Sequence, residues 1–302
     1  MNLIYQTSVG EDKVYNEIEK ISRMSFEKYA EIVDADYLLM KRRKLTIGNG
    51  CRNSLYFESL APIFDEKLDV YDKILVADID VVCNTEDNIF ELSDASVYGV
   101  NEADTISNKK WGVEDYRCVG EWDYDEEVYQ RYVDKFRKHG MPYKRSAIND
   151  PVGARYASKL FSLQSGVLVW TREARQKARL EFDNWNEFCY PVPKDPNDLS
   201  SSDQPFITGS LLKYGFDIEC INFRWNDNPE NYIKPQSEMD SIKFAHYAGS
   251  AAKKQMIQHA RLGWFKMVEG YTCDTLPEFK LTNRVKVWPG GVRNDGIYKF
   301  LK

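Results

Sequence analysis

Short apolar runs alternate along this chain with segments that have the apolar spacing of an amphipathic helix. Residues 3–7 form the first run, and Val14, Ile18 and Ile21 follow at spacings that place them on one face of a helix. Strands that alternate with helices in this way are typical of a parallel sheet covered by helices. Further strands are predicted at residues 37–40, 74–77, 97–100, 167–170, 218–221 and 242–246. We therefore predict an α/β fold whose mostly parallel sheet is flanked by helices.

Two further helices are predicted from apolar spacing and capping residues. One would begin near Asn53 or Ser54, either of which can act as an N-cap, and would extend to Phe64. The other would follow Thr171 as its N-cap and extend to Phe188.

The predicted organisation is a single domain over residues 1–302. The chain is 43% hydrophobic, which is enough for one large core, and it contains no internal repeat. Residues 103–159 combine acidic and aromatic side chains with a charged helical segment, and we interpret them as an insertion at one end of the sheet. Either a possible acceptor-binding region or a solvated surface helix would explain this composition. Residues 256–302 are interpreted as a C-terminal extension.

Charge and cysteine content exclude several classes of protein. A net charge of −6 and an isoelectric point near 5.4 argue against a nucleic-acid-binding surface. The six cysteines form no C-x-x-C pair, so we expect reduced thiols. The sequence shows neither a signal peptide nor a transmembrane segment, so we expect a soluble, cytoplasmic protein; its oligomeric state is left open.

Three Asp-x-Asp pairs occur in the sequence, and their surroundings distinguish them. Residues 34–36 precede a predicted strand and residues 123–125 lie in an acidic segment, so both are interpreted as solvated turns. Asp78 and Asp80 follow a buried strand, at the sheet edge where open α/β folds bind ligands. If the chain is extended there, both carboxylates point to the same face, and their mutual repulsion favours a divalent cation between them. We therefore predict a Mg²⁺ or Mn²⁺ site.

Residues 71–82, YDKILVADIDVV, resemble the metal-binding strand of GT-A glycosyltransferases. The order of the later motifs is similar to family 8 of these enzymes, the group that includes glycogenin and bacterial galactosyltransferases. These motifs are the small-residue strand at 164–169, Asp203-Gln204, Trp225-Asn226, and His246 with Gly249. The resemblance covers residues 1–102 and 160–255. It implies a GT-A, Rossmann-like nucleotide-binding fold.

The resemblance also implies an activity: transfer of a sugar from a nucleoside diphosphate sugar, expected to be a UDP-sugar, to a hydroxyl of a glycan or glycoconjugate acceptor, with retention of configuration. Mn²⁺ or Mg²⁺ would be the cofactor. The implied metal ligands are Asp78, Asp80 and His246. The implied donor contacts are Thr7, Asp78, Gly166, Gly249 and Lys253. The implied catalytic residues are Asp203 and Gln204.

Each secondary motif also has a structural interpretation. His246 can be a core histidine bonded to backbone, Gly166 can mark the tight start of a strand, and Asp203 can simply favour the N-terminus of a helix. The chain also departs from the family pattern, because Ala252-Lys253-Lys254 replaces the usual Lys-Pro-Trp segment. In addition, the predicted helix at residues 55–64 carries no basic residue, and Arg52 is the nearby candidate to substitute for one.

Two other functions are compatible with an acidic α/β site. A sugar-1-phosphate nucleotidyltransferase would be expected to carry a glycine-rich basic loop after the first strand, and residues 6–12 do not form one. A non-catalytic carbohydrate-binding protein on a GT-A fold would have no need for the acidic pair and His246.

Overall fold

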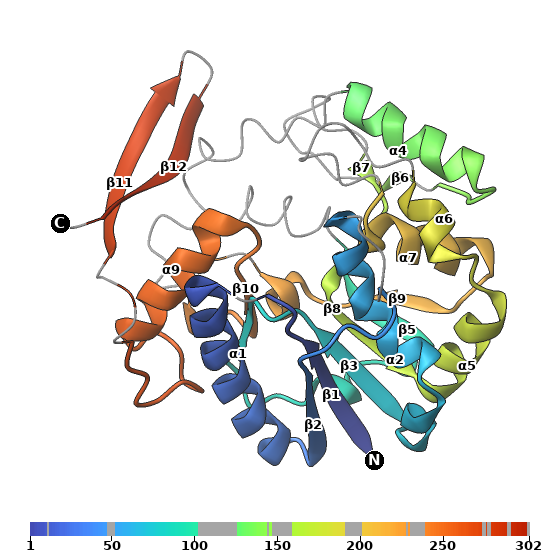
Figure 1. Cartoon of the computed structure of the whole chain (residues 1–302), viewed down its shortest axis with the longest axis horizontal. Helices are drawn as coiled ribbons and strands as arrows, with labels where there is room; N and C mark the ends of the chain where they lie inside the picture. The colour runs from blue at the N-terminus through green and yellow to red at the C-terminus, as the bar shows by residue number, and fades with distance from the viewer. Residues whose placement is uncertain are drawn as a thin grey trace.

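The computed structural model describes residues 1–10, 12–46, 52–101, 126–143, 145–146, 159–190, 201–227, 229, 239–273, 276, 279–288 and 291–300. A six-stranded sheet with the order β2-β1-β3-β8-β5-β9 forms the centre of the molecule (Figure 1). Its strands are β1 (Asn2–Thr7), β2 (Ala35–Met40), β3 (Lys73–Ala77), β5 (Val97–Asn101), β8 (Leu163–Thr171) and β9 (Ile218–Cys220). β8 runs antiparallel to its neighbours β3 and β5, and all other neighbouring pairs are parallel. The predicted α/β class with a mostly parallel sheet is confirmed.

Helices cover both faces of the sheet because successive strand residues point to opposite sides. In β3, Ile74 and Val76 belong to one buried cluster, and Leu75 and Ala77 belong to another. The helix α1 (Lys13–Ile32) packs on the second face. The first face is covered by η1 (Arg52–Leu60), α2 (Ala61–Phe64), α5 (Arg172–Glu181), α6 (Trp185–Cys189) and α7 (Asp203–Lys213).

A separate two-stranded ladder lies beside the main sheet. It pairs β4 (Val81–Cys83) with β10 (Phe244–His246) in antiparallel register, with Val81 opposite His246. The helix α9 (Ser250–Arg261) follows and packs against α1 through Ala252, Met256 and Ile257. Figure 1 shows α1 and α9 side by side next to this ladder.

Two predicted helices differ from the observed ones. Residues 52–64 form the 3₁₀ helix η1 followed by the short α2, with Pro62 in the first turn of α2, and η2 (Glu66–Val70) follows. The segment after Thr171 forms α5 and α6 instead of one helix, because Phe182 is extended and the Asn184 side chain caps α6. Thr171 is the N-cap of α5, as predicted, and accepts a hydrogen bond from the Ala174 N–H.

Most of the predicted insertion at 103–159 lies outside the described residues. Its described part contains α4 (Glu126–Lys138) and the short strands β6 (Arg145–Ser146) and β7 (Lys159–Leu160). Val133 and Phe136 of α4 are buried in the core, so this helix is packed on one side.

The remaining elements are η3 (Ile89–Glu91), η5 (Phe223–Asn226) and a hairpin of β11 (Phe279–Trp288) and β12 (Gly291–Phe300) that was not predicted. Position 256, where the extension was predicted to start, falls inside α9. The single-domain organisation stays a prediction. Cys83, Cys189, Cys220 and Cys273 are not in disulfide bonds. Within the described residues, no helix combines the length and apolar character that crossing a membrane requires.

Candidate metal centre

Asp78 and Asp80 lie in the turn that connects β3 to β4. β3 ends at Ala77, and the Val81 N–H donates to the Asp78 carbonyl over 3.1 Å, which closes the turn. The two carboxylates were predicted to share a face of an extended strand; the structure corrects this, since a tight turn brings them together. Their predicted location, at the carboxyl end of a buried strand, is confirmed.

Hydrogen bonds from two other strands fix the position of Asp78. Its N–H donates to the Gly166 carbonyl of β8 over 2.9 Å. Its carbonyl accepts from Nε2 of Gln6, over 3.1 Å. Gln6 is fully buried at the end of β1, and it also donates to Ser22 and accepts from the Tyr37 hydroxyl. Gln6 was not identified from the sequence, where an isolated glutamine in a strand gives no signal.

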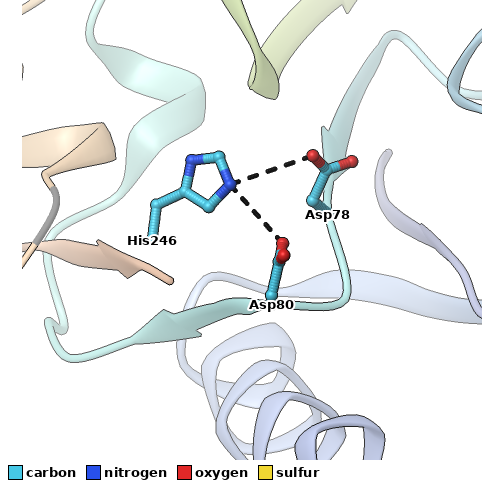
Figure 2. Close-up of side chains that lie close together, drawn as sticks. All are labelled: Asp78, Asp80 and His246. Atoms are coloured by element: carbon cyan, nitrogen blue, oxygen red, sulfur yellow. Dashed lines mark ion pairs between the residues drawn. The ribbon is translucent and has the colours of Figure 1, made fainter. Parts of the chain in front are cut away.

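His246 completes a three-residue cluster with the two aspartates (Figure 2). Its Nε2 lies 3.4 Å from Oδ1 of Asp80 and 4.0 Å from Oδ2 of Asp78. One ligand atom from each residue falls within 4.8 Å of the others. The three side chains come from the β3–β4 turn and from β10, which the β4–β10 ladder holds together.

The other ring nitrogen of His246 determines its tautomer. Nδ1 lies 2.8 Å from Oδ1 of Asn226, an acceptor, so Nδ1 carries the proton. Burial lowers the pKa of His246, but the hydrogen bond to Asp80 and the Asp80 charge outweigh it and raise that pKa, which favours a proton on Nε2. Loss of that proton would leave the Nε2 lone pair available to a metal ion. Metal-binding histidines are oriented by an outer hydrogen bond of this kind. The sequence suggested no chemical role for Asn226, and the structure gives it this positioning role.

Gly166 packs directly against the His246 ring. A Cβ atom at this position would lie 2.5 Å from Cε1 of His246 and 3.2 Å from Oδ2 of Asp78. Side chains cannot approach so closely, so only glycine accommodates the observed histidine position.

The electrostatics of the aspartate pair are asymmetric. Burial opposes ionisation of Asp80, but its hydrogen bond with His246 and the charges of His246 and Lys253 lower its pKa to about 2. Burial and then the Asp80 charge raise the pKa of Asp78, although 42% of this side chain remains accessible. Asp78 is therefore the harder of the two aspartates to ionise.

Lys253 approaches the cluster from the first turns of α9. Its Nζ lies 3.2 Å from Oδ2 of Asp80. The helix begins after Gly249, whose φ of 94° favours glycine, and the Lys253 N–H bonds to the Gly249 carbonyl. The structure thus brings Lys253 next to the Asp78–Asp80–His246 cluster, and Gly249 is the residue at which its helix begins.

Asp203 and Gln204 begin helix α7, as predicted, with Ser202 as N-cap. The Asp203 carboxylate is only 6% exposed and accepts a hydrogen bond from the Ser59 hydroxyl over 2.9 Å. Burial and then the charge of Asp78 raise its pKa to about 7, against hydrogen bonds from Ser59 and Ser165. Gln204 donates to the Ser162 hydroxyl over 3.0 Å. The pKa of Asp203 therefore depends on the charge of Asp78 in the Asp78–Asp80–His246 cluster.

The other candidate residues are distributed as follows. Thr7 ends β1, opposite Met40 of β2. Trp225 is buried and packs edge-on against Phe244, which is a core role. The side chain of Arg52 lies outside the described part of the chain. Ser59, the partner of Asp203, comes from η1 and could not be predicted because it is far from Asp203 in the sequence.

No protein-family model and no curated protein sequence matches the chain. A solved structure described as a glycosyltransferase involved in the glycosylation of the major capsid of PBCV-1 is similar to it over 86% of this chain and 98% of that chain, with 14% identity and a TM-score of 0.47. At this level the similarity carries no inference about activity.

Proposed function

We propose that this protein is a metal-dependent glycosyltransferase of the GT-A type, which transfers a sugar from a nucleoside diphosphate sugar to an acceptor hydroxyl. The observation that carries the proposal is the convergence of Asp78, Asp80 and His246 at the carboxyl edge of the sheet. This is the edge at which open α/β folds bind nucleotides. We expect a UDP-sugar as the donor and a glycan or glycoconjugate as the acceptor.

The donor set suits a divalent cation. Two carboxylates and an imidazole whose Nε2 lies beside them, once that nitrogen has lost its proton, are ligands for Mn²⁺ or Mg²⁺, with the nitrogen favouring Mn²⁺. When bound, such an ion would supply Lewis-acid neutralisation of the charge on the departing diphosphate. Asp78, Asp80 and His246 would hold it, and Asn226 would keep the imidazole in the required tautomer.

The surroundings of the cluster favour an anionic ligand. Lys253 brings an ammonium group to the cluster, and α9 presents its N-terminus at Gly249. Helix N-termini favour negatively charged groups, phosphates among them. A nucleoside diphosphate satisfies both features, and we assign Thr7, Gly166, Gly249 and Lys253 to donor binding.

Asp203 and Gln204 are assigned to the sugar. With a pKa of about 7, Asp203 can exchange a proton near neutral pH, so it can accept or donate a hydrogen bond to a sugar hydroxyl. Gln204, held by Ser162, is assigned to the region of the anomeric carbon, where an amide stabilises positive charge as the leaving group departs. We propose retention of configuration for this transfer.

A panel of nucleotide sugars tests the proposal. Each is incubated with the protein, with Mn²⁺ or with excess EDTA, and the release of nucleoside diphosphate is measured. We expect release from at least one UDP-sugar that needs the metal and is lost in Asp80→Asn. The control is Asp36→Asn, which changes an exposed aspartate of another Asp-x-Asp pair. Full activity in EDTA would contradict metal dependence, and release of pyrophosphate from a nucleoside triphosphate and a sugar phosphate would instead indicate a nucleotidyltransferase.

A further inference from the structure

Lys253 and His246 each lie close to a different carboxylate oxygen of Asp80. Nζ of Lys253 lies 3.2 Å from Oδ2, and Nε2 of His246 lies 3.4 Å from Oδ1. Asp80 is largely enclosed, with 11% of its side chain accessible. A predicted metal ligand is therefore already paired with a protein cation.

The surroundings of Lys253 hold its ammonium group in this place without burying it completely. Nζ lies 5.9 Å from the centre of the Tyr15 ring, within the range of a cation–π interaction. The Tyr15 ring in turn packs on Gly10, where a Cβ atom would lie 2.4 Å from the ring. The Lys253 side chain is still 27% accessible. Its flexible stem allows the ammonium group to exchange one anionic partner for another.

A lysine ammonium group and a divalent cation that both contact Asp80 would repel each other. This repulsion is strong because the site is partly shielded from bulk water. A second anion beside the cluster removes the conflict, since the ammonium group can then pair with that anion. The structure holds Lys253 at the N-terminal end of α9, where an anion is also favoured.

We propose that Lys253 is the internal counterion of the metal-free site and couples metal binding to diphosphate binding. It pairs with Asp80 when the site is empty, opposes binding of a divalent cation alone, and transfers to the diphosphate when both ligands are present. This inference rests on the proposed function, and it extends that function from where the ligands bind to how each one affects the other. Because such coupling is reciprocal, the metal must strengthen diphosphate binding by the same factor as the diphosphate strengthens metal binding.

Binding measurements without turnover test the inference. Binding of Mn²⁺ alone is followed by the electron paramagnetic resonance signal of the free ion, and UDP binding is followed by calorimetry with and without saturating Mn²⁺. The variants are Lys253→Met and Lys253→Gln, and Lys28→Met is the control because it removes the same charge from an exposed position on α1 that pairs with Glu269. Asp80→Asn defines the level of binding without the site. Circular dichroism establishes that each variant is folded.

We expect the unaltered protein to bind UDP about 5- to 150-fold more tightly with Mn²⁺ than without, the usual range of coupling between two sites. Lys253→Met should bind Mn²⁺ alone at least about 5-fold more tightly than the unaltered protein, and its coupling factor should be lower by a similar factor. Mn²⁺ binding that is unchanged or weaker in both Lys253 variants would overturn the inference while leaving the metal site intact. Tighter Mn²⁺ binding with an undiminished coupling factor would also overturn it, since simple charge repulsion would then suffice. If the unaltered protein binds Mn²⁺ no better than Asp80→Asn, the metal-dependent function and the inference both fail.

Discussion

The Gly166 backbone and the His246 ring are in contact so close that a Cβ atom on residue 166 would lie 2.5 Å from Cε1 of His246. The same added atom would lie 2.9 Å from Nδ1. The imidazole can therefore take its observed position only if residue 166 has no side chain. This requirement can be tested without any substrate.

Gly166→Ala should weaken Mn²⁺ binding by about 10- to 100-fold, the range typical of changes to groups that orient a metal ligand. The reason is that the new methyl group must displace the ring from the two aspartates. Metal titration of Gly166→Ala, His246→Ala and the double variant checks this. In the double variant, the glycine substitution should add little, because the ring that it displaces is gone. Equal losses from Gly166→Ala in both backgrounds would contradict a role through His246.

Asp80→Ala and His246→Ala should each lower metal-dependent turnover by at least about 100-fold, because removing a ligand costs more than disturbing its outer partner. Both side chains are largely enclosed, with 11% of Asp80 and 15% of His246 accessible, but they lie in the polar cluster and not in the apolar core, so the fold should persist. Turnover is measured together with thermal unfolding, and Asp36→Asn serves as the matched control. Near-normal turnover in either variant would show that the residue is not a ligand.

Asp203 gives the stability of the protein a characteristic pH dependence. Its pKa in the folded chain, about 7, lies above the ordinary value of about 4, so the folded state binds the proton more tightly. The contribution of this group to stability is fully present below pH 4 and is lost as the pH rises to 7, with a slope on the order of 1.4 kcal/mol per pH unit within that window. Asp203→Asn should remove this loss, so its stability relative to the unaltered protein should increase from pH 4 to pH 7 and then level off.

Urea unfolding at several pH values measures that difference. Asp134→Asn, which changes an exposed aspartate of α4, is the control and should show no such trend. A stability difference for Asp203→Asn that does not change with pH would show that Asp203 is ionised in the folded protein throughout the range.

The stereochemistry of transfer should be retaining. Among the residues that the structure describes, we assign Asp203 alone as a candidate base at the sugar site, and Asp203 is held by Ser59 at the start of α7. Proton NMR of the sugar first released from an α-linked donor, recorded before mutarotation, should therefore show the α anomer. An initial β product would assign Asp203 as the base of an inverting reaction, or direct attention to Glu114, Asp115 and Glu121, which lie outside the described residues.

The sequence predicted the strands well because buried strands of a mostly parallel sheet are continuous apolar runs, as in residues 74–77. The sequence placed Asp78 and Asp80 at the correct edge of the sheet but not in the correct backbone conformation. The same residue types can form either a turn or an extended segment. The hairpin at 279–300 was missed, although alternating Val285 and Val287 precede a Pro-Gly-Gly turn sequence.

The supporting groups of the site could not be predicted. Gln6, Ser59 and Asn226 each act on a residue far away in the chain, through single hydrogen bonds to Asp78, Asp203 and His246 respectively. These hydrogen-bond partners are brought together only by folding, so neither the spacing of residues nor the composition of the sequence predicts them. Lys253 was identified as a donor-binding residue, whereas its contact with Asp80 emerged only from the packing of α9.

The β4–β10 ladder also dictates when the metal centre can form during synthesis. Asp78 and Asp80 leave the ribosome early, whereas His246 arrives only with β10, and the register of Val81 opposite His246 joins the two. Until that late strand pairs, a growing chain holds two carboxylates without the imidazole. Long-range pairing of this kind is slow, since a large loop must close first. Capture of a cation by all three ligands would therefore report that the chain has been made and folded through β10, and a fragment that ends before β10 should not acquire this site.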